Sequence, residues 1–299
     1  MKKYQANLLL FLISVIWGGG FIFVEILLDC GMSPGMITLF RGLIFAVCAF
    51  ILYFKHIIKA TRQDLKVGLI AGVTNALGFI LQAIGQSMTS PSHASLITVT
   101  YVIFVPIFAV IFYKIKPGLK TLFAVLLCVI GAFMLVNNFS GDINGKALIG
   151  DGLVLAGAAM FGLNMAYLGH SGKQTHYGVV SFYMGLSLFV MSAVYVLATR
   201  TTQLPTERPW TVVGSILYLG LLSSTLCQIL QVVCQRHTSP VSASMILTLE
   251  GFFGGVLAVL YKDPLEWNLI VGGVIILIAV LVQEIDIKAL SKKILNKKE

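Results

Sequence analysis

The sequence predicts an all-α integral membrane protein of ten transmembrane helices, built as two inverted five-helix repeats with both termini in the cytoplasm. Three observations support this fold class: the composition is strongly apolar, apolar segments of membrane-spanning length recur along the chain, and one polar element occurs twice. Hydrophobic residues make up 58% of the chain, charged residues only 11%, and the mean hydropathy is +0.93. Because a soluble domain carries about 25% charged residues, we expect lipid to cover most of the surface.

Ten apolar segments are long enough to cross a bilayer, whose hydrocarbon core of about 30 Å requires about 20 helical residues. They lie near 6–28, 35–54, 66–88, 91–113, 119–138, 148–169, 177–198, 210–234, 240–261 and 267–285. The first segment is longer than the apolar region of a secretory signal and is therefore expected to remain as a span. Most prolines fall in the connections, but Pro106 lies inside the fourth segment and predicts a kink there.

The basic residues orient these spans. With the N-terminus in the cytoplasm, 16 Lys and Arg residues fall on the inner side and 4 on the outer side, while Arg41 lies within the second span. The positive-inside rule favours this arrangement. The same short clusters of Lys and Arg between apolar runs are typical of membrane loops, so nucleic acid is excluded as a partner.

A sixteen-residue element is duplicated at an offset of 149 residues. QAIGQSMTSPSHASLI begins at Gln82 and QVVCQRHTSPVSASMI begins at Gln231, and eight of the sixteen positions are identical. The duplication divides the chain into repeats at 1–140 and 148–287, followed by a basic cytoplasmic tail at 288–299. Five spans per repeat is an odd number, so the second repeat is inverted relative to the first. Inverted repeats are typical of secondary transporters that work by alternating access.

Several motifs resemble those of a known family. They are Trp17-Gly18, Phe40-Arg41-Gly42, the two Thr-Ser-Pro-x-x-Ala-Ser turns and Leu249-Glu250-Gly251. In these positions the chain resembles EamA-type members of the drug/metabolite transporter superfamily, although Gly251 stands where the family usually has proline. The resemblance covers the whole length as two five-helix units. It implies transport of a small organic solute such as an amino acid, another metabolite or a drug.

Glu250 is the main candidate for a functional charge. It lies about ten residues from either end of the ninth span, near the bilayer midplane, where an acidic side chain costs about 2.5–3.5 kcal/mol to insert. A structural pair with a buried cation would offset that cost. The functional interpretation is a proton-coupling carboxylate or a cation-binding group. Its positional twin in the first repeat is Tyr101, so the charge breaks the symmetry of the repeats.

Polar amides form a second set of candidates, on the third, sixth and eighth spans. Gln82 and Gln86 share one helix face, as do Gln231 and Gln235, because they are four residues apart. Hydrogen bonds between helices, worth about 0.6–2 kcal/mol each, and the lining of a cavity are both open interpretations. The predicted substrate-binding or coupling residues are Glu250, Tyr101, Gln82, Gln231, Gln228, Asn75, Asn164 and Trp17.

Trp17 precedes a run of three glycines that aligns with Phe161-Gly162-Leu163-Asn164 at an offset of 144. Such glycines interrupt a helix at a binding site or allow close packing between helices, and the sequence leaves both open. Arg41 and Glu25 lie at similar depth near the outer side. We interpret them as an ion pair or snorkelling side chains, with an anion-binding arginine at the outer gate as the alternative.

The predicted function is secondary-active transport of a small organic solute, with efflux as the expected direction. The sequence indicates no enzyme, because no loop supplies a cluster of His and acidic residues at one membrane interface. We expect no metal site and no cofactor, since no metal-ligand spacing occurs, and no ATP-driven transport, since no nucleotide-binding glycine loop occurs. Proton coupling, a homodimer and a bacterial plasma membrane are further expectations. The alternatives are a nucleotide-sugar or phosphate-ester exchanger, which should carry two basic residues inside its spans, and a non-transport membrane enzyme or scaffold.

Overall fold

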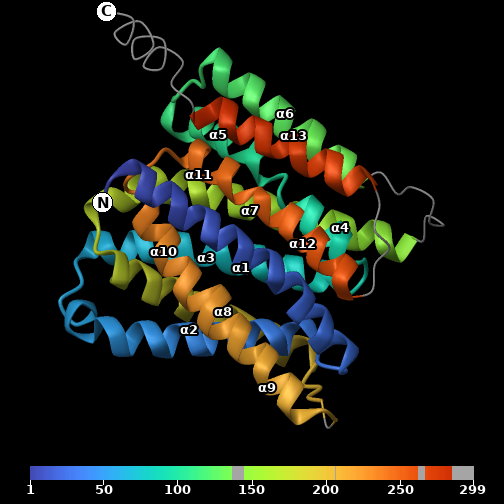
Figure 1. Ribbon diagram of the computed structural model, residues 1–299. Helices are drawn as coiled ribbons and strands as arrows, with labels where there is room; N and C mark the ends of the chain where they lie inside the picture. The colour runs from blue at the N-terminus through green and yellow to red at the C-terminus, as the bar shows by residue number, and fades with distance from the viewer. Residues whose placement is uncertain (137–144, 206, 262–266, 285–299) are drawn as a thin grey trace, which may run out of the picture.

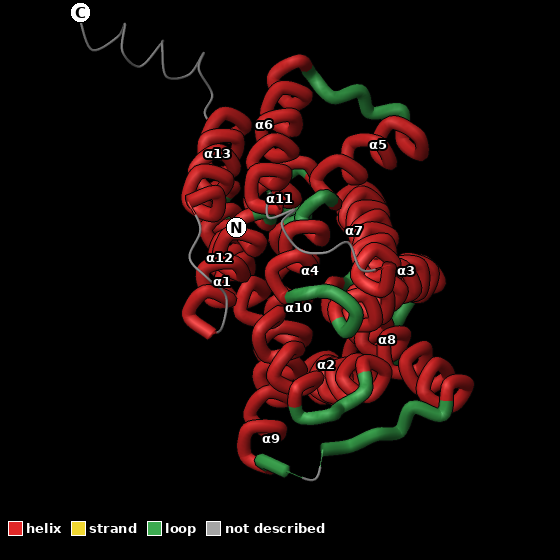
Figure 2. Tube along the Cα trace, turned by 90° about the vertical axis from the view of Figure 1, so that its right-hand side faces the viewer, coloured by secondary structure: helices red, strands yellow, loops and turns green. Residues whose placement is uncertain are grey.

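The computed structural model describes residues 1–136, 145–205, 207–261 and 267–284, and within these ranges the regular structure is entirely helical (Figures 1 and 2). Each of the ten predicted segments coincides with one helix or with consecutive helical pieces. In order they are α1 (Lys3–Asp29), α2 (Pro34–Ile57), α3 (Arg62–Gln86), α4 (Pro91–Thr98) with α5 (Tyr101–Tyr113), α6 (Leu119–Val136), α7 (Gly145–Ser171), α8 (Tyr177–Thr199), α9 (Pro209–Leu217) with η2 (Tyr218–Leu226) and α10 (Cys227–Cys234), α11 (Pro240–Leu247) with α12 (Leu249–Tyr261), and α13 (Trp267–Glu284). A short η1 (Gly172–Gln174) follows α7.

Eight of these segments, within the described ranges, are long and apolar enough to cross a membrane. The other two, in α6 and α13, contain shorter apolar stretches at Leu119–Gly131 and Ile270–Gln283. An all-helical integral membrane architecture is therefore confirmed. The basic tail predicted at 288–299 lies outside the described residues, as do 137–140 of the first predicted repeat and 285–287 of the second.

The duplicated Thr-Ser-Pro element forms the same turn in both places. The hydroxyl of Ser90 accepts a hydrogen bond from the backbone N–H of His93 at 3.2 Å, and that of Ser239 accepts one from Ser242 at 3.1 Å. Each serine caps a helix whose first residue is proline. Proline suits that position because its fixed φ fits a helix and its missing N–H would have no partner there.

Two spans are broken near their centres. The fourth is interrupted at Val99 and Thr100, between α4 and α5, and the ninth at Thr248, between α11 and α12. These positions are equivalent at the offset of 149 residues. The kink predicted at Pro106 is therefore not where the span breaks, since α5 runs through that residue. Because the ninth span breaks at the equivalent position without a proline, the break belongs to the repeat rather than to Pro106.

The helices of the two halves, residues 1–136 and 145–284, pair with one another. α2 packs on α8, α6 on α13, α1 on α12 and α5 on α7, and Figure 1 shows α6 and α13 side by side at one edge of the bundle. Glycines permit the closest approaches. A Cβ on Gly42 would lie 2.4 Å from the backbone nitrogen of Phe189, and one on Gly185 would lie 2.7 Å from that of Ala46.

The end of the bundle that carries the N-terminus is held together by a polar cluster. Asp64 accepts a hydrogen bond from the backbone N–H of His176 at 2.7 Å, the rings of His56 and His176 stack with centroids 4.0 Å apart, and Arg236 donates to the carbonyl of Thr175. Burial, followed by the neighbouring His56 and Arg236, lowers the pKa of the His176 imidazole below its ordinary value. The cluster joins α2 and α3 of the first half to loops of the second.

Candidate functional site

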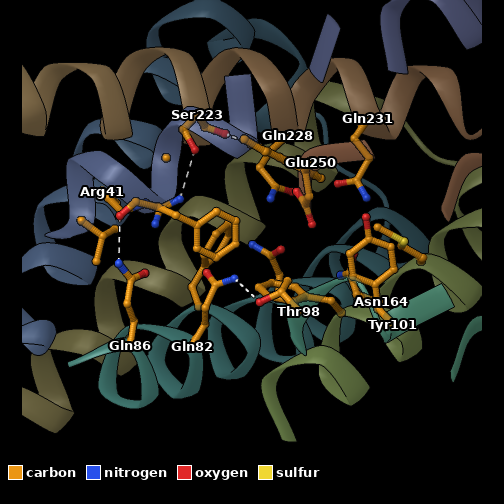
Figure 3. Close-up of a pocket in the computed structure, with 18 residues that line it drawn as sticks. Arg41, Gln82, Gln86, Thr98, Tyr101, Asn164, Ser223, Gln228, Gln231 and Glu250 are labelled. Atoms are coloured by element: carbon orange, nitrogen blue, oxygen red, sulfur yellow. Dashed lines mark hydrogen bonds between the residues drawn. The ribbon is translucent and has the colours of Figure 1, made fainter. Parts of the chain in front are cut away.

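A pocket of about 530 Å³, counting the space at its open side, lies between the two halves and is lined by 18 residues. All eight residues predicted from the sequence as substrate-binding or coupling residues line it, and so does Arg41. They come from α1, α2, α3, α5, α7, α10 and α12, and Figure 3 shows the side chains that it labels converging on the pocket.

The pocket extends from the middle of the bundle toward the end opposite the N-terminus. On α3 it is lined from Asn75 to Gln86, which covers the C-terminal half of that helix, and on α1 from Trp17 to Val24. α2 contributes Arg41, close to its beginning. The polar cluster of His56, Asp64, His176 and Arg236 lies at the other end of these helices.

Tyr101 and Glu250 enter the pocket from the two broken spans, each in the first turn after the break. Both are almost fully buried, with exposed fractions of 1% and 3%. The Tyr101 hydroxyl points toward Glu250 and Gln231 (Figure 3) and interacts electrostatically with the carboxyl group of Glu250. Within the described residues that hydroxyl has no hydrogen-bond partner of ordinary geometry. A ligand between these groups would therefore meet a hydroxyl and a carboxyl side by side.

Glycines on the neighbouring helices position both of these turns. A Cβ on Gly18 would lie 2.9 Å from the Glu250 carbonyl and 2.8 Å from the backbone nitrogen of Gly254, and one on Gly162 would lie 3.2 Å from the Tyr101 carbonyl. α1 and α7 continue unbroken through these glycines. Close packing is thus the correct interpretation of the paired glycines, and the interruptions occur instead in the helices that pack against them.

Arg41 is buried, with an exposed fraction of 4%. Its Nε donates to the Ser224 hydroxyl at 3.1 Å and one terminal nitrogen donates to the Ser223 hydroxyl at 3.3 Å, while the guanidinium lies 4.2 Å from the centre of the Phe79 ring. Glu25 is outside the pocket lining and accepts a hydrogen bond from Gln86 at 3.4 Å. The pairing of Arg41 with Glu25 stays a prediction.

Some amide side chains of the pocket form hydrogen bonds with protein groups, and others have a buried atom without such a bond. Asn164 donates to the Ala71 carbonyl at 2.8 Å, and Gln82 donates to the Thr98 hydroxyl at 2.9 Å, so both serve the packing of helices as well as the cavity. The Nδ2 of Asn75 and the Oε1 of Gln228 are buried without a hydrogen-bond partner among the described residues. Buried amides are normally satisfied, which indicates that these two face polar groups brought in by a ligand or water.

Ser223 and Ser224 are functional candidates that the sequence did not single out. They lie in η2, a π-helical segment of the eighth span in which the Thr225 hydroxyl donates to the Gly220 carbonyl at 2.7 Å. The Ser223 carbonyl also accepts a hydrogen bond from the indole N–H of Trp17 at 2.9 Å. No sequence signal marks the π-helix, although such segments are frequent at functional sites. The other lining residues that the sequence did not single out are mainly apolar, among them Phe21, Val24, Phe79 and Met165.

Comparison with known proteins agrees with the fold and the motifs. The family model described as the EamA-like transporter family matches residues 5–137 and again 148–283. An uncharacterized transporter of Archaeoglobus fulgidus is 31% identical over 259 residues, which cover 87% of this chain and 79% of that protein. A solved crystal structure with 12% identity superposes with a TM-score of 0.79 over 97% of this chain and 99% of that one, which shows the fold alone. The chain therefore belongs to the EamA-like transporter family and is a multi-pass membrane transporter of the drug/metabolite transporter superfamily.

Proposed function

We propose that the protein is a secondary-active transporter that moves a small organic solute by alternating access, with Glu250 as the charge that engages the cargo or a coupling proton. The observation that carries this proposal is the pocket itself. It lies between the two halves, and equivalent breaks in their spans deliver Tyr101 from one half and Glu250 from the other. A site at a repeat interface, built on discontinuous helices, is typical of secondary transporters.

In this proposal all ten apolar segments cross the membrane as two inverted five-helix repeats with both termini in the cytoplasm. The excess of Lys and Arg on the N-terminal side supports the orientation. The pairing of α6 with α13 supports two further spans, because these helices shield each other's buried faces. We expect a bacterial plasma membrane as the location and efflux as the direction.

Glu250 also favours proton coupling without a bound cofactor. A carboxyl at the centre of a membrane protein takes up and releases protons as its surroundings change, and such groups form proton relays in transporters. The expected partners are the solute and the lipid bilayer, and a homodimer stays an untested expectation. Among the charged residues of the pocket lining only Arg41 is basic, which disfavours a phosphate-ester exchanger that would need two.

The function can be tested by reconstituting the full-length protein into lipid vesicles and imposing a pH gradient. Uptake is measured for a panel of amino acids and cationic drugs against vesicles without protein. We expect at least one solute to be accumulated, and its accumulation to collapse when a protonophore removes the gradient. Failure of every solute to move, with or without the gradient, would contradict the proposed function.

The orientation has a separate test in the two Thr-Ser-Pro turns. Single cysteines placed at Ser87 and His237 in a cysteine-free chain are labelled with a membrane-impermeant maleimide from either side of intact cells. We expect Ser87→Cys to react from outside and His237→Cys only after the membrane is permeabilised. Reaction of both from the same side would exclude the inverted arrangement.

A further inference from the structure

We propose that Arg236 is a latch, a contact that must break before the cytoplasmic end of the bundle opens, and that protonation of His176 beside it releases the latch. The inference rests on the proposed function and deepens it by naming a regulation of alternating access. The pocket extends from the middle of the bundle toward the end opposite the N-terminus, so the end that carries the N-terminus is the closed one. Arg236 lies there, in the turn between α10 and α11, and donates to the Thr175 carbonyl in the loop before α8.

The duplication provides a comparison for this contact, because each half also has a link that is present at both ends. In the first half, Ser33 precedes α2 and its hydroxyl donates to the Thr201 carbonyl, just after α8, at 2.7 Å. In the second half, His176 precedes α8 and its backbone N–H donates to Asp64, at the beginning of α3, at 2.7 Å. These equivalent links join the two halves at the open end and at the closed end alike, so they do not distinguish the two ends.

The contact of Arg236 does distinguish them. At the offset of 149 residues its counterpart is Ser87, whose hydroxyl donates to the Ile84 carbonyl of the preceding helix at 2.7 Å. The Arg236 guanidinium also lies 5.4 Å from the centre of the Tyr177 ring, within range of a cation–π contact. Because inverted repeats alternate access by exchanging conformations, the second half has to break the Arg236 contact to adopt the arrangement of the first.

The closed end also buries a polar group that opening would satisfy. Gln235 is 1% exposed, and both of its amide atoms lack a hydrogen-bond partner among the described residues. Its counterpart Gln86 donates to the Phe21 carbonyl of α1 at 2.8 Å. A buried amide without a partner is costly, so the closed arrangement needs compensating contacts such as that of Arg236. We therefore expect the loss of the Arg236 contact to favour opening.

His176 is the group that makes the latch sensitive to pH. Its ring stacks on that of His56 with centroids 4.0 Å apart and planes at 13°. The titratable and charged side chains around it are Tyr53 and His56 of α2, Asp64 of α3, Tyr177 of α8, and Arg236. A proton on His176 would place a positive charge beside Arg236 and against the His56 ring, and among these neighbours only Asp64 is acidic. Protonation therefore weakens the closed arrangement.

The direction of the pH dependence follows from the same neighbours. Burial, then His56 and Arg236, lower the pKa of His176 in the closed arrangement, although Asp64 acts in the opposite direction. When the end opens and Arg236 moves away, that pKa returns toward its ordinary value of about 6.5. The open state then binds a proton more tightly than the closed state. The closed state is thus fully favoured above about pH 6.5 and loses its advantage as the pH falls through that value toward the lowered pKa.

The test measures how often the cytoplasmic end opens, in inside-out membrane vesicles without added solute. Met165 lines the pocket, and its counterpart Phe21 at the offset of 144 residues lines the side that is open here. A cysteine at Met165 should therefore face the cytoplasm when the inner end opens. Met165→Cys in a cysteine-free chain is labelled with a membrane-impermeant maleimide. Its rate is divided by that of the exposed His237→Cys at the same pH, which corrects for the reactivity of the thiol.

Variants at pH 8 test the latch. Adding Arg236→Gln should raise the labelling ratio about ten- to a hundredfold, as expected when a hydrogen bond from a charged group is lost. Arg62→Gln removes an exposed arginine at the same end and is the matched control without effect. If Arg236→Gln does not fold, Arg236→Lys replaces it and should raise the ratio less, because lysine keeps the charge but lacks the planar fork. A ratio that does not change when Arg236 is replaced overturns the latch.

A change of pH on the cytoplasmic side tests the role of His176 and needs no variant of Arg236. Between pH 8 and pH 6 the labelling ratio should rise at least about threefold, and His176→Gln should abolish this rise. His170→Gln removes an exposed imidazole at the same end, which stacks on Tyr113, and should leave the rise unchanged. A rise that persists in His176→Gln, or no rise in the unmodified protein, overturns release by protonation.

The outcomes separate the two proposals, because labelling requires no transported solute. Labelling that depends on Arg236 and His176 as expected, in a protein that moves no solute in vesicles, overturns the transport proposal and leaves the latch intact. Transport of a solute, with labelling ratios that depend on neither residue, overturns the latch and leaves the transport proposal intact.

Discussion

The two halves of the molecule share a scaffold and differ at its centre. Both contain a capped Thr-Ser-Pro turn and a span broken at the equivalent position. In each half the first turn after the break packs closely against a glycine of a neighbouring helix, Gly162 for Tyr101 and Gly18 for Glu250. At the equivalent position after each break, however, the first half contributes the Tyr101 hydroxyl to the pocket and the second half contributes the Glu250 carboxyl. The duplicated features therefore set the packing of the helices, while the departures from the duplication determine which polar groups face the pocket.

A second difference lies in the spans that carry the amide pairs. α3 is a continuous α-helix, whereas its counterpart in the second half passes through the π-helical η2 between α9 and α10. The π-segment holds Ser223 and Ser224 against Arg41 of the first half. The end of the pocket at Arg41 thus depends on the π-helix, which only the second half contains among the paired spans α3 and α9–α10. The end at Glu250 depends on the exchange of tyrosine for glutamate at the position equivalent to Tyr101.

The largest expected loss of stability comes from substituting the glycines that pack against the broken span of each half. Gly18→Ala and Gly162→Ala place a Cβ 2.7 Å and 2.6 Å from the Cβ of Phe253 and Phe104, respectively. Because overpacking of a close contact costs about 1–3 kcal/mol, we expect both variants to lose stability by that amount. The measurement is thermal unfolding of the purified protein in detergent, followed by intrinsic fluorescence.

Gly214→Ala is the matched control, because a Cβ at that helical position meets nothing within 4 Å. It should be neutral or raise stability by about 0.5–1 kcal/mol through helix propensity. If Gly18→Ala and Gly162→Ala behave like Gly214→Ala, the glycines do not fix the two broken spans and the shared scaffold is misassigned.

A smaller difference in stability should distinguish variants of Gln86 and Gln235, the same residue at equivalent positions of the duplicated element. Gln86 donates to the Phe21 carbonyl at 2.8 Å, whereas both amide atoms of the buried Gln235 lack partners among the described residues. Gln86→Ala should therefore cost about 1 kcal/mol more than Gln235→Ala, measured by the same unfolding assay. Equal losses would mean that the two turns are energetically equivalent despite their different hydrogen bonds.

Much of this arrangement could be predicted from the sequence. Helical spans follow from apolar length, the turns from Ser-Pro capping signals, and the presence of Glu250 in the pocket lining from the cost of an acid at midspan. The eight predicted pocket residues were found because a buried polar side chain in an apolar span requires a polar environment. The position of the helix breaks was not predictable, since Pro106 is the stronger local signal and yet lies inside α5. The π-helix was not predictable either, because its hydrogen-bond register depends on contacts with α2 and α1 that only the folded chain provides.

In the proposed function, transport depends on Glu250, the charge that distinguishes the two halves. The most direct test of this dependence is uptake into vesicles under an imposed pH gradient by the unmodified protein, Glu250→Gln and Tyr101→Phe. We expect Glu250→Gln to lose at least about 99% of the uptake rate, as when an interaction worth about 2.7 kcal/mol is removed, and to respond no longer to the gradient. Tyr101→Phe should retain both properties with a reduced rate. Unchanged uptake and unchanged pH dependence in Glu250→Gln would contradict this dependence.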